Sequence, residues 1–318
     1  MPFPRATVRS RSTTGGALAA VLLLSLPWAV SAQGAPGALP PIPIDTFTLD
    51  NDLRVIVSED HSAPVVAVNV WYHVGSANEE EGRSGFAHLF EHMLFSETEN
   101  LEPGAMDRLV TRAGGVYNAT TSNDRTAYFE VLPSNRVNLA LWLHAERMAR
   151  LKVNAQAFET QRDVVKEERR MRIDNQPYGE AQLVLDTLSQ SYGPYRHTVI
   201  GSMAHLDAAG TDDVATFYER FYVPSNAVLT VVGDVTVAQV RELAETYLGD
   251  IPGGRRAPSL PEPPPTPRTD GERRAVVEDP FAQLPLLWVA YTIPPASHED
   301  QYALDPVSYT HLRAHETV

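Results

Sequence analysis

Apolar residues alternate with polar ones, or gather in short runs of β-branched and aromatic residues, at several places along the chain. The runs occupy residues 47–49, 53–57, 65–74, 116–121, 126–132 and 227–233. Such runs, bounded by turn residues, predict β-strands. The first two flank Asp50, Asn51 and Asp52, a turn signal that predicts a hairpin. The chain is therefore expected to form a sheet whose strands come from distant parts of the sequence.

Longer segments between and after these strands are predicted as helices. They occupy residues 84–95, about 103–113, 136–151, 155–173, 182–191, 211–222 and 237–248. Gly114 and Gly115 stop the second of them. Strands mixed with long helices predict an α+β fold, in which a mostly antiparallel sheet packs against helices. We expect residues 45–251 to form this domain.

The helix predicted at residues 84–95 reads SGFAHLFEHMLF and carries two histidines and a glutamate on one face. His88 and His92 are four residues apart, and Glu91 follows His88 by three. Two imidazoles and a carboxylate that converge can hold a divalent metal ion and activate a water molecule. This HxxEH order inverts the HExxH order of zinc helices and is typical of inverzincins. The alternative is a surface helix with two ordinary histidines.

Apolar side chains surround this motif on nearly all sides of the helix. They are Phe86, Leu89, Phe90, Met93, Leu94 and Phe95. The pattern predicts a buried helix. Ionisable groups are costly to bury without a partner, and a metal ion supplies that partner. The predicted burial therefore favours the metal-site hypothesis over the alternative of ordinary histidines.

Several stretches of the chain, this helix among them, are similar to the pitrilysin/insulinase-type zinc peptidases, which include mitochondrial processing peptidase and bacterial periplasmic relatives. The stretches are residues 74–95, 114–133, 161–179 and 221–235. The resemblance extends from about Phe47 to Asp305. It implies the same α+β fold, one Zn²⁺ per chain, and hydrolysis of peptide bonds in extended or unfolded peptides.

The resemblance also completes the metal site. His88 and His92 leave zinc one protein ligand short of the usual three plus water. The family supplies a glutamate 76 residues after the second histidine, which here is Glu168. Glu167 is the neighbouring rival, and helical periodicity does not separate the two, so the family spacing decides for Glu168. For either glutamate the ordinary alternative is a solvated charge on a helix. Glu91 is then expected to act as the general base.

Further positions match the family pattern. Residues 116–121 are expected to be an edge strand along which a substrate lies as an extra strand, with Asn118 and Ala119 as substrate contacts. Glu79 matches a family position whose role is open. Gln161 stands where the family often has a glutamate seven residues before the ligand, so an orienting role there would fall to an amide. Other histidines lack the spacing of ligands: His61, His73, His144, His197 and His205.

The 318 residues include no cysteine and carry a formal net charge of −14 at pH 7. Without cysteine there are no disulfides, and a closed structural zinc site, which often uses cysteine, is disfavoured. A chain this acidic is a poor partner for nucleic acid or for an anionic membrane. The expected partners are peptide substrates and a peptidase-family subunit, either a second copy or a different chain.

The N-terminus predicts export. Arg5, Arg9 and Arg11 precede an apolar run at residues 16–30, and small residues at positions 30–32 resemble a cleavage site. The run is shorter than the roughly 20 residues that span a bilayer, so residues 1–32 are predicted as a cleaved signal peptide, with an uncleaved anchor as the alternative. Residues 33–44 are expected to be a flexible leader, and the mature protein is expected to be periplasmic.

The pattern changes after the first domain. Residues 252–274 are rich in proline and predict a linker. Residues 277–279 followed by 286–291 then echo residues 57–60 followed by 65–72. We therefore interpret residues 275–305 as the truncated start of a second, homologous domain. Residues 306–318 include VSYTHLRAHET, a reading frame of an adapter used in DNA sequencing libraries, and are interpreted as an assembly artefact.

The resemblance has a consequence for activity. The family encloses its substrate between two domain halves, so we expect this chain to bind zinc but to cleave peptides poorly. The alternative function is a non-catalytic or partner-dependent subunit of a heteromeric processing peptidase. Such subunits usually lose the metal-site residues, whereas His88, Glu91, His92 and Glu168 are all present.

Overall fold

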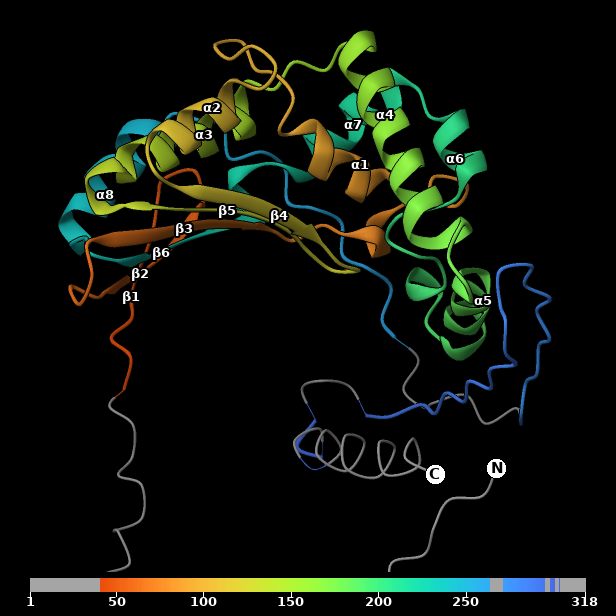
Figure 1. Cartoon of the computed structure of the whole chain (residues 1–318). Coiled ribbons are helices and arrows are strands. Elements are labelled where there is room, and N and C mark those ends of the chain that lie inside the picture. Colours follow the sequence, from red (N-terminus) through yellow and green to blue (C-terminus); the bar gives the residue numbers. More distant parts are fainter. Residues whose placement is uncertain (1–40, 264–270, 295–297, 301–302, 304–318) are drawn as a thin grey trace, which may run out of the picture. The chain divides into compact units, whose positions relative to one another are not determined.

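A single mixed sheet forms the centre of the fold in the computed structural model, which describes residues 41–263, 271–294, 298–300 and 303. Its six strands lie in the order β1-β2-β6-β3-β5-β4 (Figure 1). They are β1 (Asp45–Thr48), β2 (Arg54–Glu59), β3 (Val65–Tyr72), β4 (Val116–Thr121), β5 (Thr126–Pro133) and β6 (Ala227–Gly233). Only β2 and β6 pair in parallel; the other neighbours pair antiparallel. The predicted mostly antiparallel sheet is confirmed.

Most of the helices lie over one face of this sheet (Figure 1). The helices are α1 (Phe86–Met93), α2 (Ala105–Arg112), α3 (Val137–Ala149), α4 (Ala155–Arg169), α5 (Gly179–Ser189), α6 (Met203–Ala208), α7 (Thr211–Phe221) and α8 (Val237–Leu248). Of these, α5 lies away from the sheet (Figure 1). The α+β class predicted from the sequence is therefore correct. Among the described residues, no helix is both long and apolar enough to cross a membrane.

The alternation within β3 shows why one face is covered. Val66, Val68 and Val70 are fully buried, whereas Val65 and Trp71 are each 46% exposed. Successive side chains of a strand point to opposite faces, so the buried set packs against the helices and the other set faces away from them. The open face carries further apolar side chains from neighbouring strands, namely Val116, Val131 and Val232.

Two helical features differ from the prediction. The segment predicted as one helix over residues 155–173 is α-helical only to Arg169 and continues as a π-helix, Arg170–Asp174. Helix α6 was not predicted. It has six residues, too few to show a periodic pattern, and it begins where the Ser202 side chain accepts a hydrogen bond from His205 N.

The segment after the first domain has no regular structure in its described part. Residues 286–291, which echo β3 in sequence, form no strand, and Leu287 is 83% exposed. A strand needs a neighbouring strand to satisfy its backbone, and the described residues provide none here. Tyr178 contacts this segment by donating from its hydroxyl to Leu284 O at 2.9 Å. The linker between two domains at residues 252–274 stays a prediction. Residues 1–32 and 306–318 lie outside the described part of the chain.

Candidate metal centre

Helix α1 lies inside the fold, as its composition predicts. Phe86, Leu89, Phe90 and Met93 are buried, and the Phe90 ring stacks on Phe217 of α7 at a centroid distance of 5.4 Å. Tyr128 of β5 donates from its hydroxyl to Phe90 O at 3.1 Å. The helix is therefore held between the sheet and α7, and its polar residues are confined to the remaining face.

That face brings two histidines toward α4. The rings of His88 and His92 lie 4.9 Å apart and are nearly perpendicular. Glu168, near the end of α4, places its Oε2 3.2 Å from His92 Nε2 and 3.6 Å from His88 Nε2. These side chains are only 11–23% exposed. Two helices distant in sequence thus aim three potential ligand atoms at one point.

The donor set and its spacing fit a zinc ion. One atom from each of His88, His92 and Glu168 lies within 4.8 Å of the others, and no other such group occurs among the described residues. Ligands at about 2.0–2.2 Å on a tetrahedral ion are about 3.4 Å from one another. The two nitrogen–oxygen distances lie close to that value. Three protein ligands leave a fourth position for a water molecule or a substrate, as in catalytic sites.

Burial prepares His88 for this role. Burial and, to a smaller extent, the neighbouring His92 together lower the pKa of His88 to about 4. The ring is therefore neutral at physiological pH, which is the form that donates a lone pair to a metal ion.

The structure separates the two neighbouring glutamates. Glu168 is 13% exposed and faces the histidines, whereas Glu167 is 63% exposed and pairs with Arg170 on the surface. The second carboxylate oxygen of Glu168, Oε1, lies 2.7 Å from Arg172 Nη1. Arg172 belongs to the π-helix that continues α4, a type of turn that often marks a functional site. One oxygen of Glu168 thus faces the histidines while the other binds a cation.

Glu91 lies on the same face of α1 and contacts the edge of the sheet. Its Oε2 accepts a hydrogen bond from Thr121 Oγ1 at 2.5 Å. Burial raises the pKa of Glu91, and the Thr121 hydrogen bond opposes that rise. Thr121 is the last residue of β4, which is an edge strand as predicted. The contact therefore links the metal helix to the edge on which a substrate is expected.

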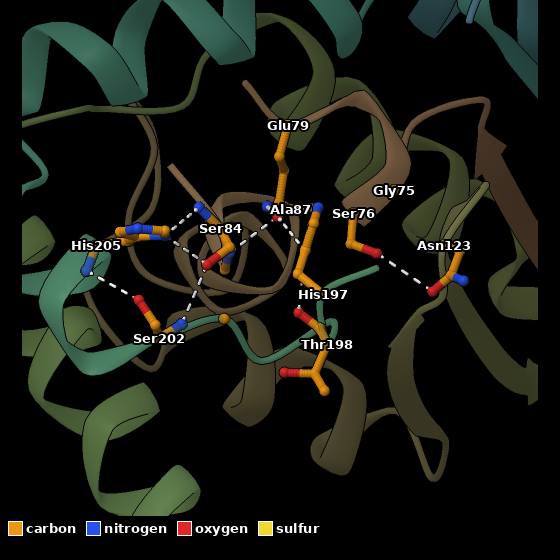
Figure 2. Close-up of polar contacts among 12 residues, drawn as sticks. Gly75, Ser76, Glu79, Ser84, Ala87, Asn123, His197, Thr198, Ser202 and His205 are labelled. Atoms are coloured by element: carbon orange, nitrogen blue, oxygen red, sulfur yellow. Dashed lines mark hydrogen bonds and ion pairs between the residues drawn. The ribbon is translucent and has the colours of Figure 1, made fainter. Parts of the chain in front are cut away.

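Glu79 anchors the beginning of α1 (Figure 2). Its buried carboxylate accepts hydrogen bonds from Gly85 N at 2.9 Å and Ala87 N at 2.8 Å. Burial raises the pKa of Glu79 to about 8, against the lowering effect of these backbone groups. A carboxylate at a helix N-terminus satisfies backbone donors that have no partner within the helix. The structure gives Glu79 a capping contact rather than one with the ligands.

The other predicted site positions, Gln161, Asn118 and Ala119, have no hydrogen bond to the ligand residues in the described part of the chain. Gln161 lies on α4, and its side chain forms no hydrogen bond among the described residues, so the structure gives no orienting contact for it. Asn118 is exposed on β4, while the Ala119 side chain is buried. Ala119 N donates to Asn118 Oδ1 at 2.8 Å.

Sequence reasoning missed Thr121 and Arg172. The spacing of Arg172 four residues after Glu168 was a usable signal, because oppositely charged residues at that spacing meet on a helix. No local pattern could have paired Thr121 with Glu91, since the contact joins a strand end to a helix 30 residues earlier.

Comparison with known proteins finds two family matches along the chain. A family model for insulinase (peptidase family M16) matches residues 54–194, and the model for the M16 inactive domain matches residues 209–309. The second match includes β6, a central strand of the sheet, so the two matches contribute to one folded domain.

Individual relatives are similar over most of the chain. Zinc protease PqqE of Helicobacter pylori is 37% identical over 293 residues, which cover 92% of this chain and 65% of that protein. The probable mitochondrial-processing peptidase subunit beta of Arabidopsis thaliana is 30% identical over 204 residues, covering 62% of this chain and 38% of that protein.

A solved structure shares the fold. The crystal structure of a protease from Helicobacter pylori matches with a TM-score of 0.66 at 37% identity, covering 70% of this chain and 53% of that one. The chain thus spans less than two thirds of the length of these relatives. On both family matches and these similarities, the chain belongs to the insulinase-type peptidases of family M16.

Proposed function

We propose that the protein is a zinc-dependent endopeptidase that hydrolyses peptide bonds in extended or unfolded peptides. The observation that carries the proposal is the convergence of His88, His92 and Glu168 within 4.8 Å, with Glu91 on the same helix face. The zinc proteases among its relatives support the same class of reaction. Because the chain spans only part of those relatives, the proposal concerns the whole protein.

The proposed roles follow from the donor set. His88, His92 and Glu168 would hold one zinc ion per chain through two neutral nitrogens and one carboxylate oxygen. Bound zinc supplies Lewis acidity, which polarises a peptide carbonyl and makes a water molecule acidic near neutral pH. Arg172 would keep Glu168 turned toward the histidines by binding its other oxygen.

Glu91 is proposed as the general base and acid. Its carboxylate would accept a proton from the attacking water and then deliver it to the leaving amine nitrogen. Burial raises the pKa of Glu91 from its ordinary value, which moves the group toward the pH at which proton transfer in both directions is efficient. Thr121 would hold the carboxylate in place.

The proposed peptide site is the open edge of β4. Within the part of the chain that the structure describes, this strand pairs only with β5, so its other edge could accept an extended peptide as an additional strand. Asn118 and Ala119 lie in the middle of this strand, and Thr121 at its end contacts Glu91. Main-chain pairing of this kind selects extended conformation more than sequence, which fits unfolded peptides as substrates.

The proposal also covers where the protein acts and with which subunit it assembles. Export to the periplasm rests on the sequence of residues 1–32. Assembly with a second peptidase-family subunit is suggested by the Arabidopsis thaliana relative, which is named as a subunit of a processing peptidase. In such a pair we assign the catalytic role to this chain, because it retains every residue of the proposed site.

The test uses a quenched-fluorescence peptide and the variant Glu91→Gln. The wild-type chain should bind one zinc ion and show chelator-sensitive hydrolysis that is slow in the 318-residue chain and faster in a protein of the relatives' length. Glu91→Gln should retain zinc and lose hydrolysis, because the base is not a ligand. Zinc binding with no hydrolysis by the longer protein, alone or with a partner subunit, would contradict the proposal. So would full activity in Glu91→Gln.

A further inference from the structure

Residues 197–209, which we call the clasp, contact both helices that carry the candidate zinc ligands. Most of the clasp lies between the two family matches, which end at residue 194 and resume at residue 209. It contains α6, the helix that the sequence did not predict. On the α1 side, the clasp contacts Ser84 and Gly85 at the start of the helix. On the α4 side, it binds positively charged side chains.

On the α1 side, the clasp holds the residue where the chain enters the metal helix (Figure 2). Ser84 is buried, and its Oγ lies 2.7 Å from His205 Nδ1 and accepts from Ser202 N at 3.1 Å. Ser84 N also donates to His205 Nδ1, at 3.2 Å. The hydroxyl has one proton, which is available for His205, so Nδ1 acts as the acceptor of both bonds. His205 thereby fixes the start of α1 through its Nδ1 atom.

The backbones of the two segments also meet directly. A side chain at Gly201 would place its Cβ 2.3 Å from Ser84 O and 2.5 Å from Gly85 Cα. Gly201 has a φ of +74° and Gly85 a φ of +98°, a region that glycine adopts without strain. The close approach therefore requires glycine on both sides, and it leaves little room for α1 to shift relative to the clasp.

On the α4 side, three cations bind the clasp in succession. Arg162, Lys166 and Arg169 follow one another at spacings of four and three residues, so they share one stripe of α4. Lys166 Nζ lies 2.5 Å from Asp207 Oδ1, and Arg162 Nη1 donates to Ala209 O at 3.4 Å.

The third of these cations, Arg169, donates to the backbone oxygen of Gly201. Gly201 is the same glycine that meets Ser84 and Gly85. Lys166 and Arg169 stand on either side of Glu168 in the sequence. The clasp is thus bound next to the third ligand as well as next to the helix that carries the first two.

We infer that the clasp sets the distance between α1 and α4, and thereby holds the three ligand side chains ready for zinc before the ion binds. Ser84 and His205 are positioning residues, because they act on the ligands through the start of α1. A ligand set held in place loses less freedom on binding, so its affinity for zinc is higher. The inference rests on the proposed zinc site and adds a structural requirement to it.

The test measures zinc affinity by competition with a chromophoric chelator, together with urea unfolding of the metal-free protein. Ser84→Ala and His205→Ala should each weaken zinc binding about 10-fold, the lower end of the range for residues behind metal ligands. The double variant should cost less affinity than the sum of the two single ones, because both remove the bond between Ser84 Oγ and His205 Nδ1. His205→Asn should recover most of the affinity, since its side-chain oxygen retains an acceptor near the position of Nδ1.

Ser134→Ala is the matched control. Ser134 donates from its hydroxyl to Asp234 Oδ2 at 2.9 Å, a bond that involves no residue of the clasp. This variant should lose some stability, because it removes a serine hydrogen bond elsewhere in the domain, while keeping wild-type zinc affinity. If His205→Ala does not fold, Lys166→Gln reports from the α4 side and should also weaken zinc binding.

The outcomes separate two failures. Wild-type zinc affinity in Ser84→Ala, His205→Ala and Lys166→Gln would overturn the clasp and leave the zinc site standing. An equal loss of affinity in Ser134→Ala would also overturn it, because the effect would then follow general stability. A wild-type chain that binds no zinc would overturn the proposed site and the clasp together.

Discussion

Two clusters in this domain bring histidine to glutamate, and they differ in what completes them. In one, β5 and α3 bring Glu130 against His144 and Arg147, with all three side chains at most 1% exposed. In the other, α1 and α4 bring His88 and His92 against Glu168, with side chains 11–23% exposed. The residue types are alike, but only the first cluster has its own cation between its members.

The buried cluster is closed. Glu130 Oε1 lies 2.6 Å from Arg147 Nη2, and Glu130 Oε2 lies 2.8 Å from His144 Nε2. Burial alone would raise the pKa of Glu130, but the Arg147 and His144 charges and hydrogen bonds outweigh it and hold the pKa at about 2. Both oxygens have partners, so no position remains for an ion.

The metal cluster is open. Glu168 directs one oxygen at two imidazole nitrogens and gives its other oxygen to Arg172, outside the group. Among the residues that the structure describes, Glu168 has an arginine partner only at its other oxygen, so an added cation can take the place between the three ligand atoms. A histidine–glutamate cluster is therefore structural when a fixed cation closes it, and suited to a metal ion when the position between its members is left free.

The largest effect is expected from removing a ligand of the open cluster. His92→Ala or Glu168→Gln should lower zinc affinity by more than the 10- to 100-fold typical of residues behind the ligands. The measurement is competition with a chromophoric chelator at fixed pH. Glu167→Gln is the matched control, because its carboxylate lies on the surface with Arg170. Loss of zinc in Glu167→Gln, with retention in Glu168→Gln, would reverse the assignment of the third ligand.

In the closed cluster, the large effect should fall on stability. Glu130→Gln leaves the Arg147 charge buried without its counter-charge, which costs about 3–5 kcal/mol of unfolding free energy. Urea unfolding of the metal-free protein measures the change. Zinc affinity of the fraction that remains folded should be close to wild type. A variant as stable as wild type would show that the Glu130–Arg147 pair does not hold β5 to α3.

The closed cluster should also govern acid unfolding. The pKa of Glu130 is about 2 in the folded protein, below its ordinary value of 4.5, so the stabilisation is complete above pH 4.5 and disappears as the pH falls toward 2. A shift of that size corresponds to about 3 kcal/mol. Unfolding free energies between pH 6 and pH 2 should therefore fall more steeply for wild type than for Glu130→Gln. Parallel curves would contradict this account.

The smallest effect concerns the base beside the open cluster. The Thr121 hydrogen bond lowers the pKa of Glu91, so Thr121→Val should raise it. The acidic limb of the pH–rate profile should move to higher pH, while zinc affinity stays unchanged. The profile is best recorded with the longer protein on a quenched-fluorescence peptide. An unchanged acidic limb would show that Glu91 is not the group that titrates there.

The two clusters were not equally visible in the sequence. His88, Glu91 and His92 stand on one helical turn, so periodicity alone places them together, and a family spacing led to Glu168. His144 has no ligand spacing, and its partner Glu130 comes from a different element, so only the fold reveals the closed cluster. The sheet was predictable because each strand carries its own alternation.

The other differences between the predicted and the observed elements have physical reasons. Helix α6 is too short for a periodic signal and is held by its contacts with α1 and α4. The π-helical turn after Arg169 cannot be told from an α-helix by composition. Residues 286–291 have strand-like composition, but a strand also requires a neighbour, and composition does not report whether one is present.

The most direct measurement is anomalous diffraction at the zinc absorption edge from crystals of this chain grown with zinc. We expect one strong peak between His88 Nε2, His92 Nε2 and Glu168 Oε2, and no peak beside Glu130 and His144. A map with no peak at the open cluster, or with a peak at the closed cluster, would contradict the claim that a missing internal cation marks the metal site.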